Sequence, residues 1–266
     1  MSELLEVEDL TVTFPTTRGP VDVVRNVSFT VGRDETVGIV GESGSGKSMT
    51  SLAVMGLLPK GARTSGSIRL DGVELLGRPE RELRRLRGDQ MSMIFQDPLS
   101  SLNPYYTVGL QIEEMYRAHR DRSRKAARKV AVEALAQVGL PDPERRAGHY
   151  PHQFSGGQRQ RIMIAMALVC RPKLLIADEP TTALDVTVQA QILRLLADLR
   201  SQSGTGMVFI THDLAVISSI ATRVLVMRRG EQIEYGTAEQ IFAEPRHAYT
   251  RMLLESIPRI DDEVAP

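Results

Sequence analysis

Residues 41–48, Gly-Glu-Ser-Gly-Ser-Gly-Lys-Ser, have the residue types and spacing of a phosphate-binding loop, G-x-x-x-x-G-K-S. A short β-branched run at residues 36–40 precedes the loop, and a helix expected over residues 49–58 follows it. In this setting the backbone N–H groups of the loop surround a phosphate chain, and the positive end of the helix dipole faces the same anions. Lys47 is expected to reach the β- and γ-phosphates, and the Ser48 hydroxyl to bind Mg²⁺. The residues predicted to contact a nucleoside triphosphate here are Gly41, Ser43, Gly44, Ser45, Gly46, Lys47, Ser48 and Met49.

Two carboxylates follow a second buried segment. Residues 174–177, Leu-Leu-Ile-Ala, form a continuous apolar run that is typical of a strand buried on both faces, and Asp178 and Glu179 come next. Asp178 is placed to hold Mg²⁺, directly or through water. Glu179 would face the γ-phosphate and polarise the attacking water as a general base. A plain Asp-Glu turn is the alternative, but the phosphate loop in the same chain favours the catalytic interpretation.

A third group, Ser155-Gly156-Gly157-Gln158, lies before a helix expected over residues 162–169. Backbone N–H groups at such a helix start form an anion site. Two phosphate-binding helix starts in one chain can serve a single nucleotide if two chains pair head to tail. A helix N-cap without a ligand is the alternative.

Composition limits the classes of function. The 266 residues carry 33 basic and 33 acidic side chains, so no overall field attracts nucleic acid. The basic stretch at residues 117–129 is better explained as a solvated helix face than as a nucleic-acid or lipid patch. The single cysteine, Cys170, excludes an internal disulfide or a cysteine-ligated cluster and is expected to be a small buried side chain. The acidic N-terminus has no apolar signal core and no segment approaches a membrane span, so a cytoplasmic location is expected.

Alternating apolar and polar residues predict half-buried antiparallel strands at residues 4–14 and 21–31, with a connection at residues 15–20. Another strand at residues 67–70 ends in the Asp71-Gly72 turn, so a β-rich portion flanks the phosphate loop. The remaining elements expected outside the middle of the chain are a short helix at 78–87, strands at 91–95, 207–210 and 223–227, a helix at 188–203, and two helices on either side of Pro245. The repetition of strand, helix and strand favours a parallel sheet.

The middle of the chain, residues 97–169, has the character of a helical insert. A loop punctuated by Pro98, Asn103-Pro104 and Gly109 is expected to open it, and apolar residues at helical spacing predict a helix over residues 123–138.

With these pieces in this order, the chain resembles the ATP-binding subunits of ABC transporters over essentially its whole length. Ser155-Gly156-Gly157-Gln158 is similar to the signature motif of that family, with Phe154 where leucine is usual. The resemblance implies further roles for four residues: Phe14 would stack on adenine, Gln96 would contact the metal and the attacking water, Asp185 of Ala183-Leu184-Asp185 would lie at a dimer interface, and His212 would contact the γ-phosphate. Their alternatives are a strand core residue, a solvated strand end, a helix N-cap and a structural histidine.

The resemblance also implies an α/β fold: a P-loop NTPase core with a mostly parallel sheet, an antiparallel β subdomain and an α-helical insert. Residues 1–240 would form the ATPase domain, with the insert at about 97–169, and residues 241–266 a short C-terminal extension. ATP and Mg²⁺ are the implied cofactors. The implied catalytic residues are Glu179, His212 and Gln96; the implied metal ligands are Ser48, Gln96 and Asp178; and Ser155, Gly156, Gly157, Gln158 and Asp185 join the nucleotide contacts.

Residues 95–104, 177–187 and 245–251 resemble the subfamily that powers uptake of dipeptides, oligopeptides and nickel. Many peptide-importing relatives carry a longer tail, some with several cysteines. This chain has Cys170 as its single cysteine, so it cannot hold a cysteine-ligated cluster, and an importer of nickel or a metal chelate stays an alternative. The implied partners are transmembrane permease subunits, a second ATP-binding subunit in a hetero- or homodimer and, indirectly, an extracytoplasmic binding protein, at the cytoplasmic face of the membrane and without nucleic acid. The alternatives are a non-transport ABC ATPase acting on nucleic acid or ribosomes and, more distantly, a P-loop kinase.

Overall fold

The computed structural model describes residues 3–97, 101–120, 123–182 and 184–255. The chain divides into two compact units. Unit 1 comprises residues 1–31, 35–76 and 209–266, and unit 2 comprises residues 32–34 and 77–208. Strand β8 (Gly206–Ile210) runs across the division.

The antiparallel part of unit 1 forms where the alternating pattern predicts it. Strand β1 (Leu5–Thr16) pairs with β2 (Gly19–Val31) on one side and with β4 (Arg63–Leu70) on the other, and β4 continues into β5 (Val73–Glu74). The connection between β1 and β2 is shorter than the expected residues 15–20. Pro15 still pairs with Pro20 and Thr16 with Gly19, so the strands extend to a two-residue turn.

The rest of unit 1 supports the phosphate loop. Strands β3 (Thr36–Val40) and β9 (Arg223–Arg228) are parallel neighbours, and β3 is buried along its whole length. Helix α1 (Lys47–Met55) contacts β1 and β2, and helix α9 (Leu214–Ile220) contacts β3. Helix α1 ends three residues earlier than expected, because Gly56 takes a left-handed conformation with φ 63° and caps it.

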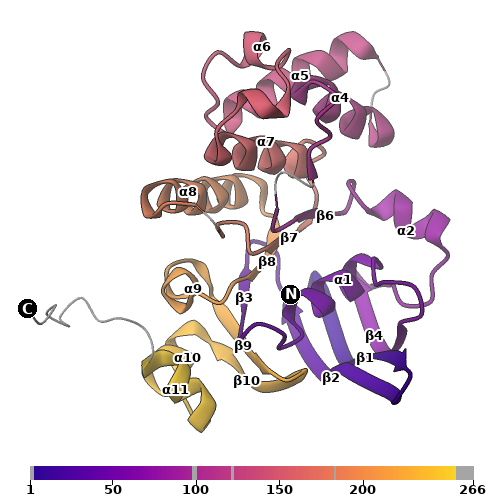
Figure 1. The fold of residues 1–266 in the computed structure, drawn as a ribbon, viewed down its shortest axis with the longest axis vertical. Helices are drawn as coiled ribbons and strands as arrows, with labels where there is room; N and C mark the ends of the chain where they lie inside the picture. The colour runs from indigo at the N-terminus through magenta and orange to yellow at the C-terminus, as the bar shows by residue number, and fades with distance from the viewer. Residues whose placement is uncertain (1–2, 98–100, 121–122, 183, 256–266) are drawn as a thin grey trace, which may run out of the picture. The chain divides into compact units, whose positions relative to one another are not determined.

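Strand β10 (Glu231–Thr237) was not predicted. It is antiparallel to β9 across a turn in which Arg229 and Gly230 both have positive φ. Its sequence is charged and only half-buried, so it lacks the apolar pattern that signals a strand. Helices α10 (Ala238–Ala243) and α11 (Ala248–Glu255) follow it beside the same strand, as Figure 1 shows in yellow, and confirm the two tail helices.

Unit 2 combines parallel strands with the helical insert. Strands β6 (Met91–Ile94) and β7 (Leu174–Asp178) are parallel and fully buried. The helices outside the insert are α2 (Glu80–Leu86) and α8 (Val186–Ser203). The insert contains α4 (Val108–His119), α5 (Arg124–Gln137), α6 (Pro143–Arg146), a 3-10 turn η1 (Pro151–Gln153) and α7 (Gly156–Leu168), which gather together in Figure 1. The predicted α/β class with an antiparallel portion and a helical insert is confirmed.

Helix α4 is a correction within the insert. Gly109 was expected to mark a loop, but it lies in the first turn of this helix, which Thr107 caps by accepting from the Leu110 backbone N–H at 3.4 Å. A side chain at Gly109 would come within 2.6 Å of the Ala147 carbonyl oxygen. The glycine therefore permits close packing of α4 and does not break the chain.

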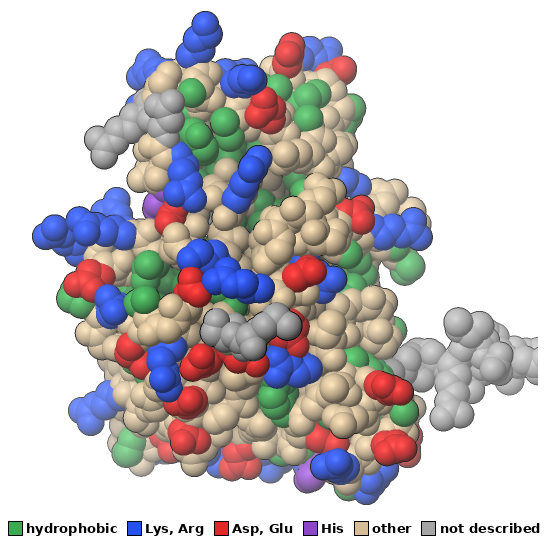
Figure 2. Space-filling view, turned by 180° about the vertical axis from the view of Figure 1, so that it is seen from behind, with side chains coloured by type: hydrophobic (Ala, Val, Ile, Leu, Met, Phe, Trp, Pro, Cys, Tyr) green, Lys and Arg blue, Asp and Glu red, His purple; other side chains and the backbone are tan. Residues whose placement is uncertain are grey.

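The surface agrees with the balanced composition. Basic and acidic side chains are interspersed on the face shown in Figure 2, so this face carries no continuous field of one sign. Among the helices that the structure describes, none is long and apolar enough to cross a membrane.

Candidate nucleotide-binding site

The loop at residues 41–46 lies between β3 and α1, and two of its glycines are required by close packing. Gly41 and Gly46 have φ angles of 151° and 101°, in the region that favours glycine. A side chain at Gly41 would overlap the Met227 carbonyl oxygen, and one at Gly46 would come within 2.8 Å of the Val23 carbonyl oxygen. The loop is therefore held against the backbone of neighbouring strands.

Lys47, the first residue of α1, directs its side chain to this loop. Its side chain is 5% exposed, and Nζ donates to the carbonyl oxygens of Gly41 at 2.7 Å and Glu42 at 3.0 Å. Ser48 and Met49 occupy the first turn of α1, with Ser48 exposed. The loop thus places a lysine ammonium group and a helix start together, which is the arrangement that binds phosphate.

Two carboxylates with predicted roles in metal binding and catalysis lie at the end of β7. Asp178 is the last residue of this strand and is 8% exposed. Glu179 follows it with φ 48°, a conformation that non-glycine residues adopt only at a cost. Its Oε2 accepts from Gln96 Nε2 at 3.0 Å and from the Thr182 hydroxyl at 2.9 Å. The structure therefore brings together Gln96 and Glu179, two of the predicted catalytic residues.

Sequence reasoning did not single out Thr182. A threonine three residues after a predicted general base is a weak signal, because nothing in the sequence shows that the chain turns back there. The turn is visible in the structure, where the Thr182 backbone N–H donates to the Glu179 carbonyl at 3.3 Å.

The group at residues 155–158 begins α7, six residues earlier than expected. Ser155 is its N-cap: the Ser155 hydroxyl accepts from the Gln158 N–H at 3.4 Å, and the Gln158 side chain accepts from the Ser155 N–H at 3.2 Å. A side chain at Gly157 would meet Val188 at 2.7 Å, whereas the space beside Gly156 is open. The capping role is present, and it leaves the nucleotide contact a prediction.

Asp185 caps helix α8 by accepting from the Val188 backbone N–H at 2.9 Å. Ala183 of the same predicted motif lies outside the described residues. Phe14 is half-buried on β1, so it is not a fully enclosed core residue, and His212 is exposed between β8 and α9. The nucleotide and interface roles of Asp185, Phe14 and His212 stay predictions.

Cys170 is a buried residue, as predicted. It is 3% exposed, and its Sγ lies 3.8 Å from the Met115 carbonyl oxygen. Burial raises the pKa of its thiol to about 11, so the group is a neutral thiol near pH 7. In the described ranges, no group of three or more His, Cys, Asp or Glu residues is suited to hold a metal ion.

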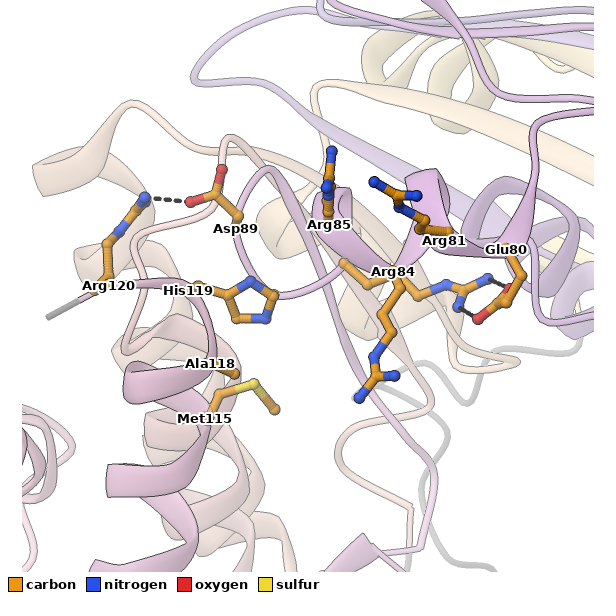
Figure 3. A pocket seen from close by; sticks show the side chains of 11 residues that line it. Glu80, Arg81, Arg84, Arg85, Asp89, Met115, Ala118, His119 and Arg120 are labelled. Carbon is orange, nitrogen blue, oxygen red and sulfur yellow. Dashed lines mark hydrogen bonds and ion pairs between the residues drawn. The ribbon is translucent and has the colours of Figure 1, made fainter. Parts of the chain in front are cut away.

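A basic pocket on unit 2, of about 1160 Å³, lies between helix α2 and the end of α4 (Figure 3). Arg87 donates to both carboxylate oxygens of Glu80, and Arg120 pairs with Asp89. The other polar side chains around it are Arg81, Arg84, Arg85 and His119. Positive charge therefore exceeds negative charge around this pocket.

Comparison with known proteins identifies the family of this chain. A model of the ABC transporter family matches residues 24–182, and a model of the oligopeptide/dipeptide transporter C-terminal region matches residues 233–265. The oligopeptide transport ATP-binding protein OppD of Salmonella typhimurium is 54% identical over 262 residues, covering 98% of this chain and 78% of OppD. OppD of Bacillus subtilis is 52% identical over 263 residues, covering 98% of this chain and 74% of that protein.

Solved structures show the same fold. The ATP-binding cassette MJ0796, in a dimeric post-hydrolysis state bound to ADP and Pi, superposes with a TM-score of 0.78 and 30% identity over 88% of this chain and 98% of the cassette. The cbiO1 protein of Clostridium perfringens, part of the ABC transporter complex cbiONQ, gives 0.77 and 27% identity, covering 98% of each chain. With a family match over more than half its length, the chain belongs to the ABC transporter family, as an ATP-binding and ATP-hydrolysing subunit.

Proposed function

We propose that this chain hydrolyses ATP to drive a peptide importer. The observation that supports the hydrolytic part is the pairing of Glu179 with Gln96 at the end of β7, because it holds the carboxylate that we propose as the general base. The peptide part is supported by the C-terminal match and by the similarity to OppD. A nickel or metal-chelate substrate stays a prediction without a comparable observation.

The proposed roles follow the chemistry of each group. Lys47 and the backbone of the phosphate loop bind the phosphates, and Glu179 accepts the proton of the attacking water, with His212 assisting. Mg²⁺ would be held by Ser48, Gln96 and Asp178. Their oxygen donors suit this ion, which keeps several waters and takes only one or two carboxylates from a protein. When bound, Mg²⁺ neutralises charge on the phosphates.

We further propose that a second ATP-binding subunit completes each nucleotide site. In this proposal Ser155, Gly156, Gly157 and Gln158 of one subunit contact the ATP held by the phosphate loop of the other, and Asp185 lies at the interface. The open space beside Gly156 and the dimeric state of MJ0796 support this arrangement. Residues 1–240 would act as the ATPase domain and residues 241–266 as an extension, of which residues 256–266 lie outside the described part.

The basic pocket is the proposed contact for an acidic segment of a permease. Arg81, Arg84 and Arg85 share one face of α2, where like charges at this spacing repel one another. Among the residues that the structure describes, Arg81 and Arg85 form no side-chain hydrogen bond and no ion pair shorter than 4 Å. The Arg87 hydrogen bond, with a smaller contribution from the charge of Arg84, lowers the pKa of Glu80. A carboxylate-bearing segment would relieve this repulsion.

Coexpression with permease subunits tests this proposal. Wild-type chain should enter the membrane fraction only when the permease is present, and these cells should take up a labelled peptide. The amount of the variant with Arg81→Glu, Arg84→Glu and Arg85→Glu in the membrane fraction should fall by about tenfold or more. The new glutamates would face the acidic segment of the permease and repel it. A matched control on α5, with Arg124→Glu, Lys125→Glu and Lys129→Glu, should behave as wild type.

Two outcomes would contradict parts of this account. Nucleic-acid or ribosome binding without permease-dependent membrane association would favour a non-transport ABC ATPase. Equal retention of the α2 variant and wild type would reject the basic pocket as the contact.

A further inference from the structure

Thr182 provides the carboxylate of Glu179 with a second donor beside Gln96. The Thr182 hydroxyl donates to Oε2 of Glu179 at 2.9 Å, and Gln96 Nε2 donates to the same oxygen at 3.0 Å. All three residues belong to unit 2. Hydrogen bonds to an ionised carboxylate are stronger than those between neutral groups. Two such bonds from different segments of the chain therefore fix the position of this oxygen and limit the rotation of the carboxylate.

The backbone of Thr182 binds the same glutamate. Its N–H donates to the Glu179 carbonyl at 3.3 Å and closes the turn at residues 179–182. Pro180 takes the second position of this turn, where the fixed φ of proline is favourable. Thr182 therefore holds Glu179 at its main chain and at its side chain, and the turn sets the position of the hydroxyl.

The conformation of Glu179 explains why it needs these contacts. Its φ of 48° is one that residues other than glycine adopt at a cost, and a residue before proline prefers an extended backbone. Such a conformation persists only where surrounding contacts hold it, and it is common at active sites. The side chain is half-buried and has several rotatable bonds, so without donors it would take several orientations. The two hydrogen bonds from Thr182 oppose both kinds of freedom.

We propose that Thr182 is a positioning residue for ATP hydrolysis. Its hydroxyl keeps the Glu179 carboxylate in the orientation from which it accepts a proton of the attacking water, before that water is bound. Orientation that is already in place lowers the barrier of the chemical step and does not strengthen ATP binding. Gln96 is also a proposed metal ligand, whereas the threonine hydroxyl acts on the base alone. This inference rests on the proposed role of Glu179 as the general base.

Two substitutions at Thr182 separate the hydroxyl from the rest of the side chain. Thr182→Val keeps the branched shape and the backbone N–H but removes the donor. The kcat for ATP hydrolysis should fall by about tenfold or more, as expected when a hydrogen bond to a charged group is lost. Thr182→Ser retains a hydroxyl donor and should keep kcat within about twofold of the wild-type value.

Binding and folding are measured on the same variants. The Kd for ATP and the thermal midpoint should stay at their wild-type values in Thr182→Val, because this side chain is exposed and its proposed role is limited to the chemical step. The matched control is Thr187→Val, at an exposed threonine in the first turn of α8 of the same unit. It makes the same chemical change outside the turn and should leave kcat and the Kd unchanged.

A double-mutant cycle identifies the residue through which Thr182 acts. In the Glu179→Gln background the general base is already absent, so adding Thr182→Val should slow the residual hydrolysis by less than about twofold. Single-turnover rates, measured at a chain concentration above which they no longer rise, make the four proteins comparable. The same fold loss in both backgrounds would show that Thr182 acts independently of Glu179 and would overturn the proposal.

The remaining outcomes separate this inference from the proposed function. Slow hydrolysis in Glu179→Gln together with a wild-type kcat in Thr182→Val would overturn the inference alone. An equally low kcat in Thr182→Ser and Thr182→Val would also overturn it, because the hydroxyl would then not be the group that matters. Wild-type turnover in Glu179→Gln would reject the general base and, with it, the role of Thr182.

Discussion

Replacing Glu179 with glutamine should leave ATP binding intact and slow hydrolysis by a factor of about 10² or more, because an amide cannot accept the proton of the attacking water. Glutamine has the size of glutamate, and Glu179 has φ 48°, where both residues pay a similar backbone cost. Its amide oxygen can still accept from Thr182 or Gln96, which bind Oε2 of the native carboxylate. Single-turnover hydrolysis and the Kd for ATP, measured separately, distinguish the chemical step from binding.

Glu133→Gln provides the control for this prediction. Glu133 is an exposed carboxylate on α5 that pairs with Lys129 at 3.8 Å, so its loss should not alter turnover. Wild-type turnover in Glu179→Gln would reject the assignment of the general base. A large loss of ATP affinity in that variant would show instead that the carboxylate acts in binding.

Replacing Lys47 with alanine should weaken ATP binding by about 10²-fold, which corresponds to about 3 kcal/mol and is near the upper range for a charged hydrogen-bonding group. The substitution removes the cation that is expected to meet the phosphates. It also leaves the carbonyl oxygens of Gly41 and Glu42 without the donor that now lies 2.7 Å and 3.0 Å away. Titration with a fluorescent ATP analogue would measure the change.

The exposed Lys60, outside the loop, supplies a lysine of the same kind for comparison. Lys60→Ala should bind ATP as wild type does. An unchanged affinity in Lys47→Ala would contradict the proposed phosphate contact. The thermal midpoint should be recorded for both variants, so that a loss of folded protein is not taken for a loss of affinity.

Local patterns were sufficient to predict the parts of this fold that depend on neighbours in sequence. The phosphate loop follows a fully buried β-branched strand, and Asp178 ends a fully buried apolar one, as their continuous apolar runs predicted. Helix α8 ends at Gly204 in a left-handed conformation, where the glycine predicted its end.

Features that depend on distant contacts could not be predicted in the same way. The local sequence of Gly109 does not show that Ala147 packs closely against it. Strand β10 has no apolar pattern, and its charged residue Glu231 pairs with Arg25 of β2 at 2.7 Å. The Thr182 contact with Glu179 requires a turn in which Glu179 has a positive φ, and the sequence does not reveal this conformation. The contact between Tyr249 of α11 and Arg228 of β9 joins two elements that are separated in the sequence by β10 and α10.

The dependence of ATP turnover on protein concentration tests the central claim most directly, namely that each nucleotide site needs two subunits. ATP should bind to the dilute isolated chain, but turnover per chain should be slow there and should rise with concentration or on addition of the second ATP-binding subunit. Brisk turnover that does not depend on concentration, in protein shown to be monomeric, would contradict the claim.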